Sequence, residues 1–261
     1  MDLVDPSTAK RSRTFVTAFA RGLAVIEAFG PDAPRQTLSQ VAARAGVDRS
    51  VARRLLLTLV ELGLATTDGK QFELTPRTLR LANAYLSSAG FDSAVQSYLS
   101  ELSNKVGENA SVTILDFPEV VNIARAEAST HDPRISINMR GRLPAVFTAS
   151  GRLLMGQFPD DVIRDLLSRT EIRKFTEHTT TDRETLFRII RDARHAEIVI
   201  VSEELAKGYI AASVPLRNKA GKIIAGLNIS SHTYRMTAQD MRAKMTPVLK
   251  EYAAAISGVL K

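Results

Sequence analysis

Between residues 37 and 74 the sequence places two short helical patterns, a glycine turn and a hairpin signal in close succession. Thr37-Leu38-Ser39-Gln40 has the spacing of a capping box, in which the Thr hydroxyl accepts from the Gln amide while the Gln side chain reaches back. We expect this helix to run from Leu38 to about Ala45, with Val41 and Ala45 on its inner face. Gly46-Val47-Asp48 then predicts a tight turn, with Asp48 as the N-cap of the next helix.

The next helix is predicted from Arg49 to about Leu62. Arg49, Ser50 and Arg53 occupy one face of its first two turns, and an apolar stripe occupies the other. The predicted members of the stripe are Val51, Leu55, Thr58, Leu59 and Leu62. A short helix, a glycine-containing turn and a helix with basic and hydroxyl side chains at its start are typical of a helix-turn-helix.

Two further elements flank this pair. Phe15, Phe19, Leu23 and Ile26 recur at three- and four-residue steps, which predicts an amphipathic helix over residues 15–29. After the two helices, residues 65–67 and 71–74 are strand-like and are joined by Asp68-Gly69-Lys70, which is a strong hairpin signal. In the second of these strands Phe72 and Leu74 are predicted to point inward. Three helices followed by a hairpin predict a winged helix-turn-helix.

Basic charge is concentrated in the same part of the chain. Residues 10–80 contain twelve Lys and Arg against six Asp and Glu, in a chain whose formal net charge is +7. An arginine on a helix face is often only solvated, and helix-turn-helix shapes also serve as structural corners. The order of the elements and this local charge together favour binding to double-stranded operator DNA. We predict base contacts from Arg49, Ser50 and Arg53, and phosphate contacts from Arg54, Lys70, Arg11, Arg13 and Arg21.

Composition excludes several other classes of protein. The 261 residues include no Cys, which rules out a disulfide scaffold, a thiolate nucleophile and any Cys-ligated metal site. No apolar run approaches the roughly 18 residues that span a bilayer. The first residues, 1–6, carry acids where a signal peptide has basic residues. We therefore expect a soluble, cytoplasmic protein with no membrane contact.

The remainder of the chain alternates helical and strand-like patterns. Pro76 suits the first turn of a helix whose apolar face is Leu79, Leu81, Ala82, Tyr85 and Leu86. Helices are also predicted at 92–106, 149–157, 160–169, 183–195 and 241–260, and strands at 111–116, 120–126, 135–139, 198–203, 209–216 and 223–230. Strands in meander pairs flanked by helices indicate an α+β domain with an antiparallel sheet.

Signals for catalysis are weak in this half. No G-x-S-x-G, Walker, G-x-G-x-x-G or H-E-x-x-H motif is present, and the four His, at 131, 178, 195 and 232, are never within one helical turn of each other. Ser150-Gly151-Arg152 could form a nucleophile turn, but a helix N-terminus with exposed amides after Thr148 is favoured. We expect no catalytic residue, metal or cofactor. Two alternatives remain open: an enzyme acting on a small organic acid with an attached DNA-binding module, and an architectural DNA-binding protein.

Several motifs in this order resemble the IclR family of bacterial transcription regulators. They are residues 19–29 and 53–63, Leu74-Thr75-Pro76-Arg77, Leu143-Pro144-Ala145 followed by residues 148–154, and Val214-Pro215-Leu216 followed by residues 225–230. Asp48-Arg49 and residues 52–54 are most similar to the branch that controls aromatic-acid catabolism through the β-ketoadipate route. The resemblance implies a regulator that binds DNA as a homodimer or a dimer of dimers, and a GAF-like effector domain.

The same resemblance predicts the domain limits and the effector contacts. We expect a flexible basic tail at 1–14, the winged helix-turn-helix at 15–75, a linker helix at 76–91 and the effector domain at 92–261. By position in the family motifs, the effector contacts are Ala149, Ser150, Tyr209, Ala211, Asn228 and Ser230. Ser202-Glu203-Glu204 and Ile210-Ala211 depart from the common family pattern and leave fewer fixed polar groups. We therefore expect an aromatic or cyclic carboxylate, with Arg125, Arg140 or Arg142 as candidate counter-charges.

Overall fold

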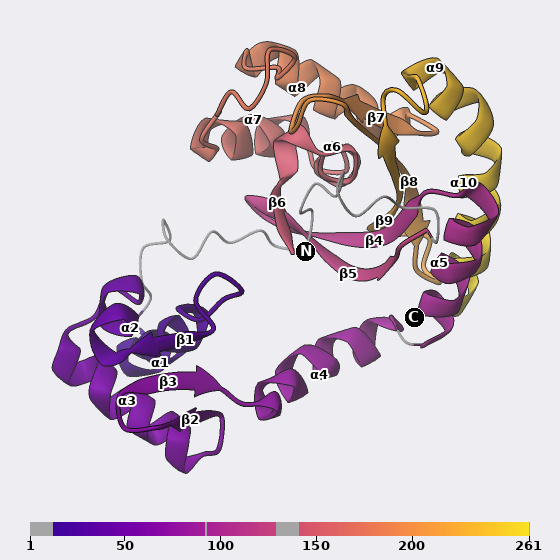
Figure 1. Cartoon of the computed structure of the whole chain (residues 1–261). Helices are drawn as coiled ribbons and strands as arrows, with labels where there is room; N and C mark the ends of the chain where they lie inside the picture. Colours follow the sequence, from indigo (N-terminus) through magenta and orange to yellow (C-terminus); the bar gives the residue numbers. More distant parts are fainter. Residues whose placement is uncertain (1–12, 92, 129–140, 261) are drawn as a thin grey trace. The chain divides into compact units, whose positions relative to one another are not determined.

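The computed structural model describes residues 13–91, 93–128 and 141–260 (Figure 1). The chain divides into two compact units, and the boundary between them falls between Tyr85 and Leu86. The last two residues of the predicted tail, Arg13 and Thr14, form a turn. Residues 1–12, which include Arg11, lie outside the described residues.

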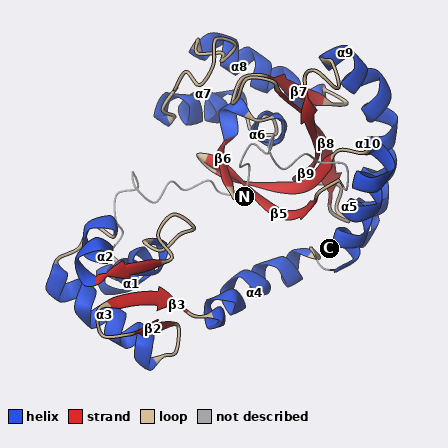
Figure 2. Cartoon of the chain, in the orientation of Figure 1, coloured by secondary structure: helices blue, strands red, loops and turns tan. Residues whose placement is uncertain are grey.

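The described part of the first unit up to Leu74 contains three helices and a small antiparallel sheet (Figure 2). The helices are α1 (Thr17–Glu27), α2 (Leu38–Arg44) and α3 (Arg49–Glu61), and the strands are β1 (Arg35–Thr37), β2 (Ala65–Thr67) and β3 (Gln71–Leu74). The sheet order is β1-β3-β2, so the predicted hairpin is extended by a third strand. We did not predict β1, because three residues are too short to show an alternating pattern.

The start of α2 confirms the predicted capping box. The Thr37 hydroxyl accepts from the Gln40 amide, and the Gln40 side chain accepts from the Thr37 amide at 2.8 Å. Asp48 occupies the N-cap position of α3, as predicted, although its side chain makes no capping hydrogen bond.

The predicted stripe of α3 was also partly wrong. The buried residues of α3 are Ala52, Leu56 and Leu59, whereas Thr58 and Leu62 are exposed. Apolar residues occupy most positions from 55 to 62, so two stripes one residue apart fit the sequence equally well. The core of the unit is completed by Val25, Val41, Ala65 and Phe72.

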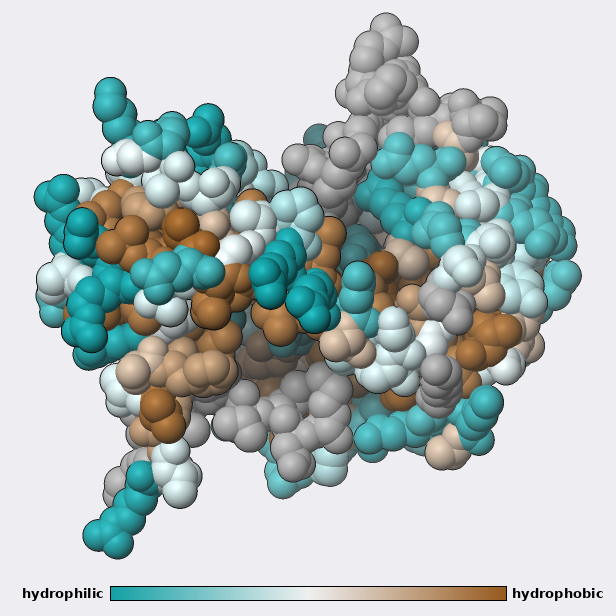
Figure 3. Space-filling view, turned by 90° about the horizontal axis from the view of Figure 1, so that it is seen from below, coloured by the Kyte–Doolittle hydropathy of each residue, from teal (hydrophilic) through white to brown (hydrophobic). Residues whose placement is uncertain are grey.

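The hairpin leads into a 3₁₀ turn at Pro76–Thr78 and then into α4 (Leu79–Ala89). Apolar side chains remain exposed along both α1 and α4. In α1 they include Phe19, which is 68% exposed, and in α4 they include Leu81, which is 62% exposed. Figure 3 shows apolar surface between hydrophilic side chains on the molecule. A monomer rarely leaves such a surface in water unless it serves binding.

The second unit is built on a six-stranded antiparallel sheet in the order β6-β5-β4-β9-β8-β7. The strands are β4 (Asn109–Asp116), β5 (Glu119–Ala126), β6 (Arg142–Pro144), β7 (Val199–Ser202), β8 (Tyr209–Arg217) and β9 (Ile223–His232). The long helices are α5 (Ser93–Val106), α6 (Ala149–Met155), α7 (Asp160–Arg169), α8 (Arg183–Asp192) and α10 (Thr246–Val259). The antiparallel α+β class is thus as predicted.

Helices cover both faces of this sheet (Figure 1). The helices α5 and α10 pack on one face and form the main core with Val112, Ala212 and Leu227. The helix α6 lies on the other face, against β4, β8 and β9. Because side chains alternate along a strand, the residues between the core positions point toward α6.

Some elements of the structure differ in detail from the predicted ones. The final helix is not continuous, because a π segment at Met241–Met245 precedes α10. The strand β6 was not predicted, since only three residues form it. The strand expected at residues 135–139 and the candidate Arg140 lie outside the described residues.

Candidate functional site

The helix α3 presents a row of cations. Arg49, Ser50, Arg53 and Arg54 are all exposed, as are Arg13 and Arg21 and, in the turn between β2 and β3, Lys70. Among the described residues none of these cations forms an ion pair within 4 Å. Their charge is therefore available to an outside partner.

Two other arginines of the same unit are neutralised by ion pairs. Arg35 pairs with Asp68 at 2.9 Å and with Glu73 at 3.4 Å, and Arg44 pairs with Asp32 at 2.7 Å. The Arg44 side chain holds the pKa of the Asp32 carboxyl below its usual range. Unpaired cations thus lie on α3, on its neighbour α1 and in the hairpin, and exposed Arg77 and Arg80 beyond the hairpin also form no ion pair among the described residues.

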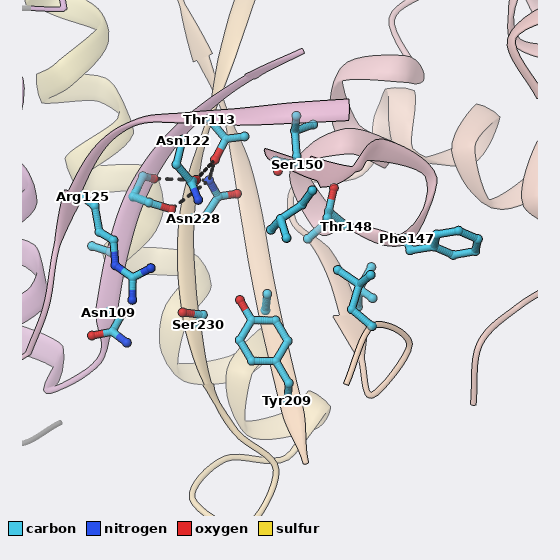
Figure 4. A pocket seen from close by; sticks show the side chains of 18 residues that line it. Asn109, Thr113, Asn122, Arg125, Phe147, Thr148, Ser150, Tyr209, Asn228 and Ser230 are labelled. Carbon is cyan, nitrogen blue, oxygen red and sulfur yellow. Dashed lines mark hydrogen bonds between the residues drawn. The ribbon is translucent and has the colours of Figure 1, made fainter. Parts of the chain in front are cut away.

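A cavity opens between the sheet and α6 in the second unit (Figure 4). Apolar side chains of Val120, Leu143, Phe147, Val201 and Leu205 form part of its wall, and polar side chains of β4, β5, β8 and β9 form the sheet side. A mostly apolar, concave site with a few fixed polar groups is the usual form of a small-molecule site. The polar residues of the lining are Asn109, Ser111, Thr113, Asn122, Arg125, Thr148, Ser150, Tyr209, Asn228 and Ser230.

A β-bulge positions two of these polar side chains. Val112 pairs with Ala124, but the next residue, Thr113, pairs with Asn122, so β5 carries one extra residue at Ile123. Residues three apart on a regular strand point to opposite faces. The bulge removes this difference and directs both Asn122 and Arg125 into the cavity.

A hydrogen-bonded network links three strands at one end of the cavity. The Asn228 amide nitrogen donates to the Thr113 hydroxyl at 2.7 Å, and this hydroxyl donates to Oδ1 of Asn122 at 2.7 Å. Figure 4 shows the three side chains meeting between β4, β5 and β9. Their orientation is therefore fixed before any ligand binds.

Arg125 and Tyr209 dominate the electrostatics of the other end. Arg125 is the one charged residue among the described cavity lining, and its guanidinium points into the cavity near Asn109 and Ser230 (Figure 4). Burial raises the pKa of the Tyr209 phenol, although a hydrogen bond with Ser230 and the charge of Arg125 oppose this shift. Tyr209 is therefore neutral at physiological pH, and the end carries net positive charge.

The other candidate counter-charge is engaged elsewhere. Arg142 begins β6, forms ion pairs with Asp116 and Glu119 at an exposed edge, and is absent from the described cavity lining.

Two glycines allow close packing of the helix α6, Gly226 against the sheet and Gly151 against the preceding turn at Ala145. A Cβ on Gly226 would lie 2.6 Å from Oγ of Ser213 and 3.1 Å from Cβ of Ser150, and one on Gly151 would lie 2.0 Å from the Ala145 carbonyl oxygen. Thr148 caps α6 by accepting from the Gly151 amide at 3.0 Å. Contrary to the expectation of exposed amides, the first turn of α6 is buried.

A buried ion pair fixes the loop that closes the cavity. Arg152 of α6 donates to both carboxylate oxygens of Glu204, at 2.7 and 2.8 Å, and its side chain is only 3% exposed. The Thr180 amide donates to the same carboxylate, and the Thr179 hydroxyl donates to the Glu204 carbonyl. The adjacent residue, Leu205, lines the cavity, so this pair positions its wall.

The structure brings all six predicted effector contacts to this one cavity: Ala149, Ser150, Tyr209, Ala211, Asn228 and Ser230. The sequence reasoning missed Thr113, Asn122 and the Arg152–Glu204 pair. The polar residues that alternate along β4 at 109, 111 and 113 were a signal that could have indicated Thr113. No local signal indicates the Arg152–Glu204 pair, because its members are 52 residues apart.

Two family models match the chain. The IclR helix-turn-helix domain matches residues 18–69, and the C-terminal domain of the bacterial transcriptional regulator IclR matches residues 83–258. The chain belongs to the IclR family. It is thus a transcriptional regulator of the IclR type, with a helix-turn-helix domain followed by the IclR C-terminal domain.

The chain is similar to named regulators and to solved structures of the IclR family. The Pca regulon regulatory protein of Pseudomonas putida is 35% identical over 90% of this chain and 81% of its own length. The p-hydroxybenzoate hydroxylase transcriptional activator of Acinetobacter baylyi is 35% identical over 96% of this chain and 95% of its own. The solved inducer-binding domain of an Acinetobacter PobR double mutant, in complex with 3-hydroxybenzoic acid, is 29% identical with a TM-score of 0.59, covering 63% of this chain and 95% of that one.

No described helix has both the length and the apolar character needed to cross a membrane. Within the same residues no cluster of three or more His, Asp or Glu has the geometry to hold a metal ion.

Proposed function

We propose that this IclR-family regulator binds double-stranded operator DNA through α3 and the β2–β3 hairpin, and that a small aromatic carboxylate in the cavity modulates this binding. The observation that carries the DNA-binding half is the set of unpaired, exposed cations on α3 beside neutralised arginines elsewhere in the unit. Cations that find no partner within the fold are suited to phosphates and base edges.

Different residues serve different parts of the DNA. Arg49, Ser50 and Arg53 in the first two turns of α3 contact base edges in the major groove, as the N-terminal residues of such a helix do. Phosphate contacts come from residues at the margin of this surface, which give affinity without sequence preference. They are Arg54, Lys70, Arg21, Arg13 and Arg11.

The cavity supports the effector half. It combines apolar walls with one cationic end, which suits a ring that carries a carboxylate. The related PobR domain is bound to 3-hydroxybenzoic acid, and a related activator is named for p-hydroxybenzoate hydroxylase. We extend this ligand class to the present chain, with contacts from Ala149, Ser150, Tyr209, Ala211, Asn228 and Ser230.

The cavity is suited to binding rather than to turnover. Among the described residues of its lining there is no His, Asp, Glu, Lys or Cys that could act as a general base for Ser150. We therefore propose that the protein is not an enzyme. Incubating a bound acid with the protein and recovering it unchanged would support this; its conversion to product would contradict it.

We also propose that the working form is a homodimer or a dimer of dimers. Two copies place two α3 helices in successive major grooves of a pseudo-palindromic operator. The exposed apolar residues of α1 and α4, such as Phe19 and Leu81, supply surface for pairing. Effector binding then shifts the population between dimer geometries that fit the operator differently.

Fluorescence anisotropy with the DNA upstream of the gene tests the DNA-binding half. We expect Arg53→Ala to cost about 1–3 kcal/mol of binding free energy and to relax base preference at one position. Lys70→Ala should weaken binding to all sequences alike and flatten the dependence of affinity on salt. Arg188→Ala, which removes an exposed arginine of α8, is the matched control and should leave both properties unchanged.

If Arg53→Ala and Lys70→Ala both reduced only non-specific affinity, α3 would not be the base-reading element. The effector half is tested in the same assay by titrating benzoate and its hydroxylated derivatives. At least one of them should change the affinity for the operator, and no response to any would contradict that half.

A further inference from the structure

We propose that the cavity selects a hydroxylated aromatic monocarboxylate in one orientation, with the carboxylate at Arg125 and the ring hydroxyl donating to Oδ1 of Asn228. This inference rests on the proposed function, because it concerns the same cavity. It goes beyond the proposed function in two respects. It assigns the carboxylate and the hydroxyl of the ligand to Arg125 and Asn228, and it makes the neutral acceptor Oδ1 of Asn228 the group that determines specificity.

The orientation of the Asn228 amide is fixed by its surroundings. One terminal atom of this side chain lies 3.3 Å from the Ser111 carbonyl oxygen and 3.2 Å from the Gly226 carbonyl oxygen. Carbonyl oxygens only accept hydrogen bonds, so the atom between them must be the amide nitrogen. The nitrogen is therefore occupied within the protein, and the other terminal atom is the oxygen Oδ1.

Oδ1 of Asn228 faces the cavity as an acceptor. No described residue donates a hydrogen bond to it. It is not fully buried either, so a molecule in the cavity can reach it. It lies beside Ser150, since a Cβ on Gly226 would be 3.6 Å from Oδ1 and 3.1 Å from Cβ of Ser150 (Figure 4). An acceptor in this place favours a ligand group that donates a proton, such as a hydroxyl. It repels a carboxylate, which is also only an acceptor.

The neighbouring side chains prevent Asn228 from turning over. The Thr113 hydroxyl donates its one proton to Oδ1 of Asn122, so toward Asn228 it acts as an acceptor. A flipped Asn228 would place its oxygen against this hydroxyl and against two carbonyl oxygens. Asn122 and Thr113 are therefore positioning residues that keep the acceptor turned toward the ligand.

Arg125 provides the complementary end for the carboxylate. Among the described residues its guanidinium forms one ion pair, from Nε to Glu127 at 3.4 Å, and Nε makes no hydrogen bond. Glu127 is 44% exposed at its side chain, whereas Arg125 is 22% exposed, so water screens the Glu127 carboxylate more. A guanidinium presents a fork of donors that matches a carboxylate.

The sheet sets the separation of the two ends. Ser111 of β4 pairs with Arg125 on one side and with Asn228 on the other, so the two ends stand two strands apart. Neighbouring strands are about 4.8 Å apart, which places the two backbones about 10 Å from each other. An aromatic ring with a carboxylate on one side and a hydroxyl on the other fits between side chains that converge across this spacing.

Calorimetry with three probes tests the assignment. The probes are benzoate, which lacks the hydroxyl, 4-hydroxybenzyl alcohol, which lacks the charge, and whichever of 3- and 4-hydroxybenzoate binds the unmodified protein more tightly. Arg125→Gln should lower the affinity for the hydroxybenzoate roughly 10- to 100-fold and leave the affinity for the alcohol almost unchanged. Asn228→Ala should remove most of an expected preference of about tenfold for the hydroxybenzoate over benzoate.

Two controls and a second variant keep the test decisive. Arg142→Gln and Asn104→Ala change an arginine and an exposed asparagine outside the described cavity lining and should bind all probes as before. If Asn228→Ala does not fold, Thr113→Val, which keeps the side-chain shape, should reduce the preference for the hydroxyl without weakening benzoate binding. The orientation is wrong if Asn228→Ala weakens benzoate and hydroxybenzoate equally, or if Arg125→Gln weakens the alcohol as much as the acid. If no probe binds the unmodified protein, the proposed effector fails, and the orientation with it.

Discussion

Arginines of the two units are placed in opposite environments. Arg49 and Arg53 on α3 are exposed and have no ion-pair partner among the described residues, whereas Arg152 on α6 is buried and bonded at every edge of its guanidinium. The first arrangement leaves the charge without a partner among the described residues, as the proposed contacts to DNA require. The second ties the guanidinium to Glu204, next to the cavity wall at Leu205. The same residue type therefore serves binding where it is unsatisfied and positioning where it is satisfied.

The largest expected effect comes from opening the buried pair. Arg152→Met leaves the Glu204 carboxylate buried without its partner, which should cost about 3–5 kcal/mol of unfolding free energy. Four of the five tyrosines, Tyr98, Tyr209, Tyr234 and Tyr252, belong to the second unit, so tyrosine fluorescence in a urea titration reports on this unit.

A matched variant separates burial from charge. Arg142→Met removes an arginine whose ion pairs lie at an exposed edge, and it should cost about 0–1 kcal/mol. Adding Glu204→Leu to Arg152→Met should recover part of the lost stability, because no uncompensated charge then remains. Equal losses from Arg152→Met and Arg142→Met would show that burial does not distinguish the two arginines.

An intermediate effect is expected where α6 meets the sheet. Gly226→Ala places a methyl group 2.6 Å from Oγ of Ser213 and 3.1 Å from Cβ of Ser150, so the helix or the strand must move. Overpacking of this kind should cost about 1–3 kcal/mol, and it should also weaken effector binding, since Ser150 lines the cavity. Thermal unfolding and calorimetry measure the two effects.

Gly258→Ala is the control for this change. Gly258 lies in α10 with nothing within 4 Å of an added Cβ, so alanine there should be neutral or stabilising by up to about 1 kcal/mol. A Gly226→Ala protein as stable as the Gly258→Ala protein would contradict the close approach of α6.

Local patterns and long-range pairings differ in how well the sequence predicts them. The capping box at Thr37 and Gln40 was predicted correctly because both partners lie within one turn. The buried stripe of α3 was misplaced by one residue, because leucines at 55, 56, 57 and 59 allow two stripes. Packing against α1 and the hairpin, which the sequence does not display, decides between them.

The cavity was only partly accessible to sequence reasoning. The six predicted contacts came from the family motifs and lie together, but the bulge at Ile123 that turns Asn122 and Arg125 to one face depends on how β4 and β5 pair. Glu204 was noted only as a departure from the family pattern. Its bond to Arg152 depends on the path of the loop between β7 and β8, which no local pattern specifies.

The smallest expected effect on stability concerns the Thr37 hydroxyl in the first unit, which is partly exposed and accepts a hydrogen bond. Thr37→Ala removes the hydroxyl that caps α2 and should cost about 1 kcal/mol. Ser39→Ala, two residues further along, removes an exposed hydroxyl with no hydrogen bond among the described residues and should change stability by less than about 0.5 kcal/mol. Hydrogen exchange at the amides of α2 measures both, because it reports local opening. Equal exchange in the two variants would mean that the capping bond adds no stability. Faster exchange in Thr37→Ala alone would show that the bonded hydroxyl at the start of α2 stabilises this helix, whereas the exposed and unbonded hydroxyl of Ser39 does not.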